Sequence, residues 1–340
     1  GYLPIEQRVT ALETGAQSEK LPAISLVDLA RNFSLHKIDL FAKNHIMTTK
    51  YRSSLLAMMA KYPRYQEILF KQMYQEVDHK KVMEYASVVF QLPGVEEQIV
   101  AFRGSNDSII SWKENFQLVT LDTVPSHQVV LNYLNEVYQQ CSGPYVLTGH
   151  SKGGNLALFG GYFMDYTDAP SSFIDVDHPI STDQMKKIYV FDGPGLSPKF
   201  TPELQQHPML EKTVQYIPES AIVGSRYYSP VRPEIVASRS FSVLQHDMRY
   251  WEINKDTLHL QEAEQVTALS LVFNQTYEEW FAEFSKDDIL AFYEVFFDLL
   301  LLMGYKSFAD VDNDLLNVLS TFPQYYQALS DKAQELIDRV

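Results

Sequence analysis

The chain has 340 residues, of which 46% are hydrophobic and 21% are charged, a balance typical of a folded globular protein. Its formal net charge of −15 argues against a nucleic-acid partner, which requires a cationic face, and disfavours charge-driven adsorption to anionic lipid headgroups. The single cysteine, Cys141, excludes an intrachain disulfide framework, and no secretory signal is visible at the N-terminus. These features predict a soluble, cytoplasmic protein.

The N-terminal part of the chain predicts helices followed by two strands. Apolar residues at spacings of three and four over residues 25–80 predict a largely helical segment. Two β-like runs follow at residues 85–92 and 98–102, and the Pro93-Gly94 pair between them predicts a hairpin turn.

The central part alternates strands with helices. A helix is predicted from the capping residue Ser126 to about Gln140, then a strand over residues 145–148, a glycine-rich turn, and a helix from Lys152 to about Tyr166. Short strands are predicted within "KKIYVFDGPG", "EKTVQYIPES" and "PEIVASRSF". This alternation predicts an α/β fold with a mostly parallel central sheet flanked by helices, whose ligand sites lie beyond the carboxyl ends of the strands.

The C-terminal region, from about Thr257 onward, has a helical and aromatic-rich pattern. We therefore expect one domain over residues 1–255 and a helical cap or extension over residues 256–340. The most apolar run, residues 289–303, carries Glu294 and Asp298, so it predicts a buried or amphipathic helix and not a transmembrane segment.

The stretch Gly149-His150-Ser151-Lys152-Gly153 matches G-x-S-x-G between a predicted strand and a predicted helix. In that context the sharp turn exposes the central serine, and the N–H groups of the helix N-terminus point at a developing oxyanion. A glycine-rich turn that binds phosphate is the alternative, but neither standard phosphate-loop motif is present. The pattern favours Ser151 as a nucleophile.

A second stretch, Phe102-Arg103-Gly104-Ser105, ends the upstream predicted strand. Together, "VAFRGS" and "VLTGHSKGGNLA" resemble the class 3 (triacylglycerol) lipases of the α/β-hydrolase fold, and resemble still more a bacterial branch of lipase-like cytoplasmic proteins that shares "VFDGPG" and "QHDMRYW". The likeness covers roughly residues 83–255. It implies an α/β-hydrolase fold and serine esterase chemistry.

The resemblance also implies an oxyanion hole. Ser105 would supply one donor, and the backbone N–H of Lys152 would supply the other. The family usually has Asp before the Trp that follows, whereas here Ser111 precedes Trp112, so the support of the oxyanion loop departs from the family pattern. Arg103 is expected to anchor that loop.

A serine hydroxyl needs a positioned base, which in this fold follows the nucleophile and the acid. His246 in "SFSVLQHDMRYW" has the right order, and the resemblance to the bacterial branch favours it. His259 in "DTLHLQ" is the alternative, because some class 3 lipases carry their base farther along the chain. His178 and His207 each precede a proline, where a role in a surface loop is expected.

Two carboxylates are candidates for the acid that orients the base. Glu219 in "TVQYIPESAIVG" stands about where class 3 lipases place Asp, and Asp192 in "YVFDGPG" ends the preceding predicted strand. Both depart from the family pattern, and we rank Glu219 slightly ahead.

The predicted reaction is hydrolysis of a carboxylic ester, of a small molecule or a lipid, through an acyl-serine intermediate without metal or organic cofactor. Residues 106–125 stand where class 3 lipases carry a lid, and Ile109, Ile110 and Trp112 make it apolar enough to cover a substrate and contact lipid. The alternative is a catalytically silent α/β-hydrolase domain that serves as a binding or scaffold module. A thioesterase or peptidase would use the same machinery.

Overall fold

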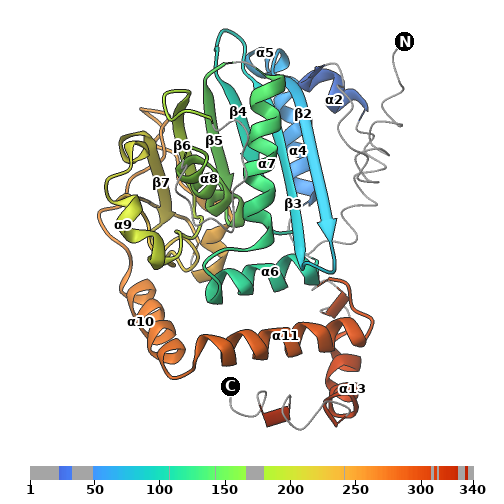
Figure 1. The fold of residues 1–340 in the computed structure, drawn as a ribbon. Coiled ribbons are helices and arrows are strands. Elements are labelled where there is room, and N and C mark those ends of the chain that lie inside the picture. Colours follow the sequence, from blue (N-terminus) through green and yellow to red (C-terminus); the bar gives the residue numbers. More distant parts are fainter. Residues whose placement is uncertain are drawn as a thin grey trace.

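The computed structural model describes residues 23–32, 49–106, 108–141, 143–165, 180–240, 242–307, 310–311, 314–327 and 334–335. An eight-stranded sheet runs through the molecule in the order β1 to β8, so that each strand neighbours the strand that follows it in the chain (Figure 1). The strands are β1 (Ile24–Ser25), β2 (Leu69–Asp78), β3 (Met83–Gln91), β4 (Gln98–Phe102), β5 (Tyr145–His150), β6 (Met185–Phe191), β7 (Thr213–Pro218) and β8 (Glu234–Val236).

The pairing of these strands divides the sheet into two parts. Strands β1 to β4 pair antiparallel with one another, and β4 to β8 pair parallel. The predicted hairpin around Pro93-Gly94 joins β3 to β4. The α/β fold with a mostly parallel central sheet is confirmed, and it is the α/β-hydrolase fold that the resemblance implies.

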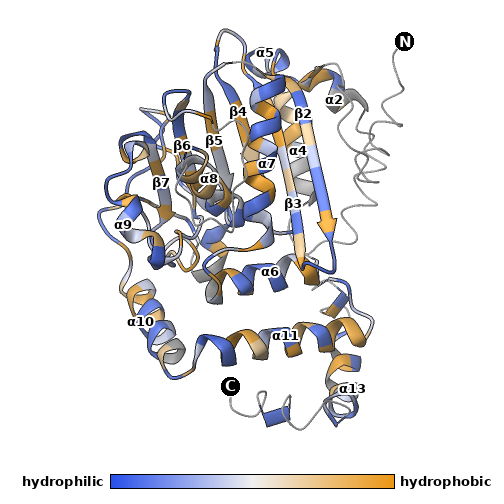
Figure 2. Ribbon diagram, viewed as in Figure 1, coloured by the Kyte–Doolittle hydropathy of each residue, from blue (hydrophilic) through white to orange (hydrophobic). Residues whose placement is uncertain are grey.

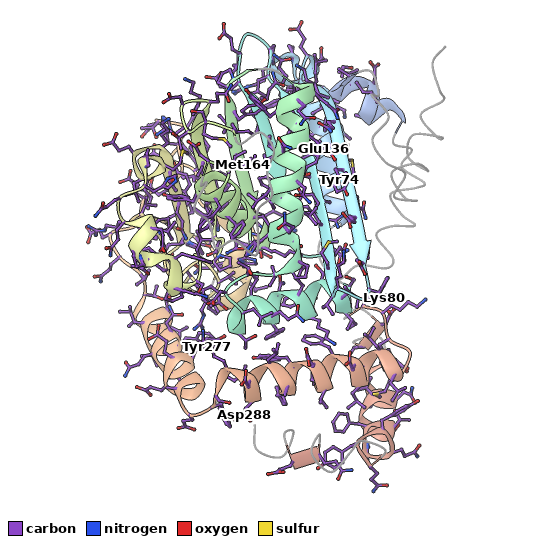
Figure 3. The ribbon with its side chains drawn as sticks, viewed as in Figure 1. Tyr74, Lys80, Glu136, Met164, Tyr277 and Asp288 are labelled. Carbon is purple, nitrogen blue, oxygen red and sulfur yellow. The ribbon has the colours of Figure 1, made fainter. Side chains whose placement is uncertain are left out.

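The segment predicted to be helical over residues 25–80 is only partly so. Helices α2 (Leu26–Asn32), α4 (Thr49–Met59) and α5 (Pro63–Gln66) lie within it, but the prediction is wrong for β2. The register of β2 against β3 shifts between Phe70 and Gln72, and this irregularity breaks the alternation by which a strand is recognised. Beyond it, Tyr74 points toward helix α7 and stacks on Tyr133, with ring centroids 5.4 Å apart (Figure 3).

Two helices cover one face of the sheet, α7 (Pro125–Gln140) and α8 (Lys152–Phe163), which lie side by side in Figure 1. In Figure 2, hydrophobic and hydrophilic bands alternate along α7, as expected of a helix with one buried face. Helix α8 is buried along its whole length. A side-chain carbon on Gly153 would lie 2.2 Å from the carbonyl oxygen of Phe102, so only glycine lets α8 approach the end of β4 this closely.

Residues 106–125, expected as a lid loop, contain the helix α6 (Ile109–Thr120), on which Ile109 and Ile110 are buried. The later loops contain short helical segments: η1 (Pro198–Phe200), α9 (Thr201–Leu204), η2 (Pro208–Lys212), η3 (Ser242–His246) and η4 (Met248–Tyr250). The last of these follow β8 and bring the chain back to the carboxyl end of the sheet.

The helices of the described C-terminal ranges include α10 (Ala268–Ala282), α11 (Lys286–Leu302) and α13 (Leu315–Gln327). Helix α11 packs along α6, where the rings of Phe116 and Tyr293 lie 4.1 Å apart. The predicted boundary between residues 255 and 256 remains a prediction. Backbone hydrogen bonds cross it, because the N–H of Ala237 donates to the carbonyl of Gln261 at 2.8 Å.

The apolar run of residues 289–303 lies almost entirely in α11, where it forms a core with α6 and not a membrane span. This core consists of Ile109, Phe297, Leu300, Tyr305 and Val318. Among the helices of the described ranges, none combines the length and apolarity needed to cross a bilayer.

Candidate active site

Ser151 occupies a strained turn between β5 and α8. Its backbone has φ 58° and ψ −131°, a region that non-glycine residues rarely adopt. The turn is held because the N–H of Ser151 donates to the carbonyl of Phe191 at 3.1 Å, and the N–H of Gly154 donates to the carbonyl of Ser151 at 2.9 Å. A side-chain carbon on Gly149 would lie 2.1 Å from Gly153, so the spacing of the glycines in the motif is required by the turn itself.

His150, the residue before Ser151, contacts the loop that carries His246. Its Nε2 donates to the backbone carbonyl of His246 at 2.6 Å, and the two imidazole rings lie 4.5 Å apart. The strand end that presents Ser151 is therefore fastened directly to the residue predicted as the base.

His246 is paired with Asp192, which directly follows β6. The Nδ1 of His246 lies 2.6 Å from Oδ2 of Asp192, and the other carboxylate oxygen accepts the N–H of Gly224 at 2.9 Å. Asp192 is 1% exposed, so its two hydrogen bonds take the place of water around a buried charge. A carboxylate on Nδ1 keeps the proton on that nitrogen and leaves Nε2 free to accept one.

The loop around His246 is held by two buried residues. The side-chain oxygen of Gln245 accepts the N–H of Ser220 at 2.9 Å, and the indole of Trp251 donates to the carbonyl of Gln245 at 2.8 Å. Trp251 lies in the "QHDMRYW" segment that the sequence singles out. Gln245 begins the same segment, although the sequence assigns it no role of its own.

The structure does not bring Glu219 to His246. Its Oε1 accepts the N–H of Ser238 at 3.2 Å, and its backbone bonds to Val236 and Thr267, so this residue joins the end of β7 to the neighbouring segments. Of the two candidate acids, Asp192 is the one that contacts the predicted base.

The other histidines have different surroundings. His259 is exposed, and its backbone bonds to Thr257 and Asn254 within its own turn. The Nδ1 of His207 caps η2 through the N–H of Met209 at 3.1 Å, and burial lowers the pKa of this imidazole. His178 lies outside the described residues.

The two predicted oxyanion donors both lie beside Ser151. A side-chain carbon on Gly104 would be 3.3 Å from Cβ of Ser151, so the chain after β4 passes against the turn. Ser105 follows, and its hydroxyl donates to Oδ1 of Asn115 on α6 at 2.7 Å. Lys152 begins α8, where the backbone N–H has no acceptor within the helix.

The side chain of Lys152 is buried and reaches β3 and α6. Its Nζ donates to the carbonyl of Glu84 at 2.7 Å and forms an ion pair with Oε2 of Glu114. Glu114 is itself completely buried, and it also accepts the N–H of Ser126 at 3.1 Å and that of Glu84 at 3.1 Å. Burial lowers the pKa of Lys152, and the Glu114 carboxylate opposes that shift.

A second carboxylate holds the loop that follows β4, the predicted oxyanion loop. Glu84 accepts from Arg103 at 2.7 Å, from the hydroxyl of Ser108 at 2.6 Å and from the amide of Asn106. Arg103 anchors the loop as expected. Ser111, which stands in place of the family's Asp, lies in the first turn of α6, where its N–H donates to Oγ of Ser108 at 3.1 Å.

Sequence reasoning assigned no role to Glu84, Glu114 or Asn115. A signal was available for Glu84, which lies in the apolar run "VMEYASVVF", but not for Glu114, whose neighbours Lys113 and Asn115 are polar. A charged residue inside an apolar segment is expected to be buried with a partner.

His127, a neutral histidine, connects α7 through Asn155 to the loop that follows Asp192. Nε2 of His127 donates to Oδ1 of Asn155 at 2.8 Å, while Nδ1 accepts the N–H of Val124 at 3.2 Å. Burial lowers the pKa of His127 to about 4. The amide of Asn155 then donates to the carbonyl of Gly195 at 2.7 Å, which ties α8 to the loop that follows Asp192.

The chemistry available at the site is that of a hydroxyl, an imidazole and a carboxylate. In the part of the chain that the structure describes, no group of three or more His, Cys, Asp or Glu side chains is arranged to hold a metal ion.

Comparison with known proteins gives a family and several similar structures. The Mbeg1-like family, which is lipase-like, matches residues 59–298, more than half of the chain. This match confirms the resemblance to lipase-like α/β hydrolases, whereas the bacterial branch remains a prediction. No curated protein matches the sequence.

Three of the similar solved structures are fungal lipases. Lipase II from Rhizopus niveus is 16% identical, covers 56% of this chain and 75% of its own, and has a TM-score of 0.35. The lipase from Rhizopus microsporus var. chinensis is 12% identical, with 64% and 78% covered and a TM-score of 0.37. The Rhizomucor miehei lipase propeptide complex is 14% identical, with 69% of each chain covered and a TM-score of 0.35.

Proposed function

The chain belongs to the Mbeg1-like family, and we propose that it is a serine hydrolase that cleaves carboxylic esters, with Ser151 as nucleophile, His246 as base and Asp192 as acid. The observation that carries the proposal is the 2.6 Å bond between His246 and Asp192. His246 also accepts a hydrogen bond from His150, the residue that precedes a serine held at φ 58° at the start of a buried helix. Such a strained serine next to an oriented imidazole is the arrangement that activates a hydroxyl.

In the proposed reaction, Nε2 of His246 accepts the proton of Ser151 while Oγ attacks the carbonyl carbon of the ester. The carbonyl electron pair moves to the oxygen, which accepts from the N–H groups of Ser105 and Lys152. When the tetrahedral intermediate collapses, the alkoxide leaves with the proton from His246. A water molecule then repeats the sequence on the acyl-serine and regenerates the enzyme.

Asp192 supports this cycle by its position and its charge. It holds Nδ1 of His246 and stabilises the imidazolium that forms during each proton transfer. Its second oxygen is fixed by Gly224, so the carboxylate keeps one orientation. We therefore propose Asp192 in place of Glu219, and His246 in place of His259.

Two exposed apolar side chains flank His246 in the chain. Leu244 and Met248, two residues to either side of His246, are 50% and 39% exposed. Such side chains suit an uncharged acyl or alkyl group, which fits a small-molecule or lipid-like ester. A lid made from residues 106–125 would have to expose Ile109 and Ile110, so it forms no part of the proposal. A cytoplasmic location stays a prediction from the sequence.

A fluorophosphonate probe tests the proposal, because it reacts with an activated serine irrespective of the natural substrate. We expect labelling of the wild type, no labelling of Ser151→Ala, and at least about 100-fold slower labelling of His246→Gln. His259→Gln is the matched control and should label at the wild-type rate. A folded wild type that resists labelling at every pH would instead indicate a silent binding module.

If the wild type reacts with the probe, assays of the same enzyme with ester, thioester and peptide substrates then identify the leaving group. Turnover of p-nitrophenyl esters of increasing chain length would define the acyl preference. Faster cleavage of thioesters or peptides than of matched oxygen esters would contradict the assignment as an esterase while leaving the nucleophile in place.

A further inference from the structure

The buried ion pair between Lys152 and Glu114 lies directly behind the proposed oxyanion hole, and the triad does not require it. Lys152 is 2% exposed and Glu114 is 0% exposed. Burying two charges carries a desolvation cost, and an apolar pair of similar volume is often at least as stable. Stability alone therefore does not account for this pair.

Glu114 joins three elements through its two carboxylate oxygens. One oxygen takes the ammonium of Lys152 and the N–H of Glu84 in β3, and the other takes the N–H and hydroxyl of Ser126 at the start of α7. Because Lys152 is the first residue of α8, its side chain fixes the turn that also carries its backbone N–H. A shift of α6 would thus move an oxyanion donor.

The next residue of α6 holds the other donor segment. Asn115 accepts the hydroxyl of Ser105 at 2.7 Å. Consecutive residues of one helix, Glu114 and Asn115, therefore fasten the two residues whose N–H groups meet the oxyanion in the proposed reaction.

We propose that Glu114 is a positioning residue: through its ion pair with Lys152 it sets the spacing between the two oxyanion donors. This inference rests on the proposed function. Oxyanion stabilisation requires donors within a narrow distance of the position that the charged oxygen takes in the transition state. A displaced donor stabilises the transition state less well but hardly affects binding of the substrate. Displacing the donor therefore lowers kcat and leaves KM largely unchanged.

The main test is the double variant Glu114→Gln/Lys152→Met, compared with wild type on a p-nitrophenyl ester. It removes both charges together and leaves the backbone N–H of residue 152 intact. The amide oxygen introduced at position 114 keeps an acceptor for Ser126, whereas the N–H of Glu84 loses its acceptor. We expect kcat to fall about 10-fold or more, with KM within about 3-fold. The inhibition constant of a boronic acid that mimics the tetrahedral adduct should rise in parallel with the loss in kcat.

The matched control is Lys113→Met on the same helix. Lys113 is also buried and ion-paired, to Asp298 of α11 at 2.6 Å, but it holds neither donor segment. The Asp298 side chain is 62% exposed, so this variant removes a contact between α6 and α11 without leaving a buried charge unpaired. We expect its kcat to stay within about 2-fold of wild type. An equal fall in kcat for Lys113→Met would overturn the proposal, because it would mark a general effect of loosening α6.

A second variant keeps the test decisive if the double variant does not fold. Glu114→Asp retains the charge but withdraws the carboxylate by one methylene, so kcat should fall in the same direction with KM unchanged. Wild-type kcat in a folded variant of either kind would overturn the positioning role while leaving the esterase proposal intact. A wild type that neither turns over esters nor reacts with fluorophosphonate would overturn both.

Discussion

Replacing Asp192 by Asn tests the proposed acid through the hydrogen bonds that surround it. The carboxylate receives donors on both oxygens, from Nδ1 of His246 at 2.6 Å and from the N–H of Gly224 at 2.9 Å. An asparagine has one oxygen and one amino group, so one of these contacts becomes donor against donor. The amide oxygen will stay with Gly224, whose N–H cannot move its proton, and the amino group will face His246.

That arrangement forces His246 into the wrong tautomer. Nδ1 must then accept a hydrogen bond, so the proton moves to Nε2, the nitrogen that has to accept from Ser151. Loss of the correct tautomer in a serine triad lowers kcat by about 10³- to 10⁴-fold. At about 1.4 kcal/mol for each factor of ten, the transition state loses about 4 to 5.5 kcal/mol.

The assay is steady-state hydrolysis of a p-nitrophenyl ester, followed by the rate of fluorophosphonate labelling. Glu219→Gln is the control, because the carboxylate of Glu219 contacts the N–H of Ser238 and not the imidazole, and its kcat should change by less than about 3-fold. The reasoning is refuted if Asp192→Asn keeps kcat within 10-fold of wild type, or if Glu219→Gln loses as much.

Three further predictions concern stability. The folded-state pKa of His127, about 4, lies below its ordinary value of 6.5, so the unfolded chain binds the proton first as pH falls. The free energy of unfolding, measured in urea, should include a contribution of about 3 kcal/mol above pH 6.5 that is lost as the pH falls to 4. In His127→Gln the free energy of unfolding should depend less on pH over this range; an unchanged pH dependence would contradict the prediction. Gly153→Ala would set a carbon 2.2 Å from the Phe102 oxygen, so a marked fall in Tm is expected, and a wild-type Tm would count against that close approach. Phe297→Ala should cost about 3 to 5 kcal/mol within a single calorimetric transition; a separate transition for the C-terminal helices would show an independent domain.

The parts of the fold with strong local patterns could be predicted from the sequence. The strand, turn and helix around Ser151 follow from an apolar run, a cluster of glycines and a renewed apolar pattern. The hairpin at Pro93-Gly94 follows from its turn residues. Strand β2 could not be recognised, because its irregular pairing at Phe70 hides the period of two.

The sequence pattern alone did not distinguish between the two candidates for the acid. Asp192 and Glu219 both follow predicted strands, so either satisfies the chain order of the fold. The register distinguishes their positions: His150 pairs with Phe191, so Asp192 follows the strand next to the one that ends at Ser151, whereas Glu219 follows a strand one position farther across the sheet. Register arises from pairing between strands distant in sequence, and a single sequence does not display it.

The order of the sheet also has a consequence for how the site is assembled during synthesis. Because each strand neighbours the next one in the chain, the sheet can grow as the polypeptide leaves the ribosome, without waiting for a distant strand to be inserted. The turn of Ser151 is complete once the carbonyl of Phe191 accepts the N–H of Ser151, and Asp192 is the next residue to be synthesised. His246 emerges only after β8. The nascent chain therefore carries a folded serine turn without its proposed base until the segment after β8 has folded back.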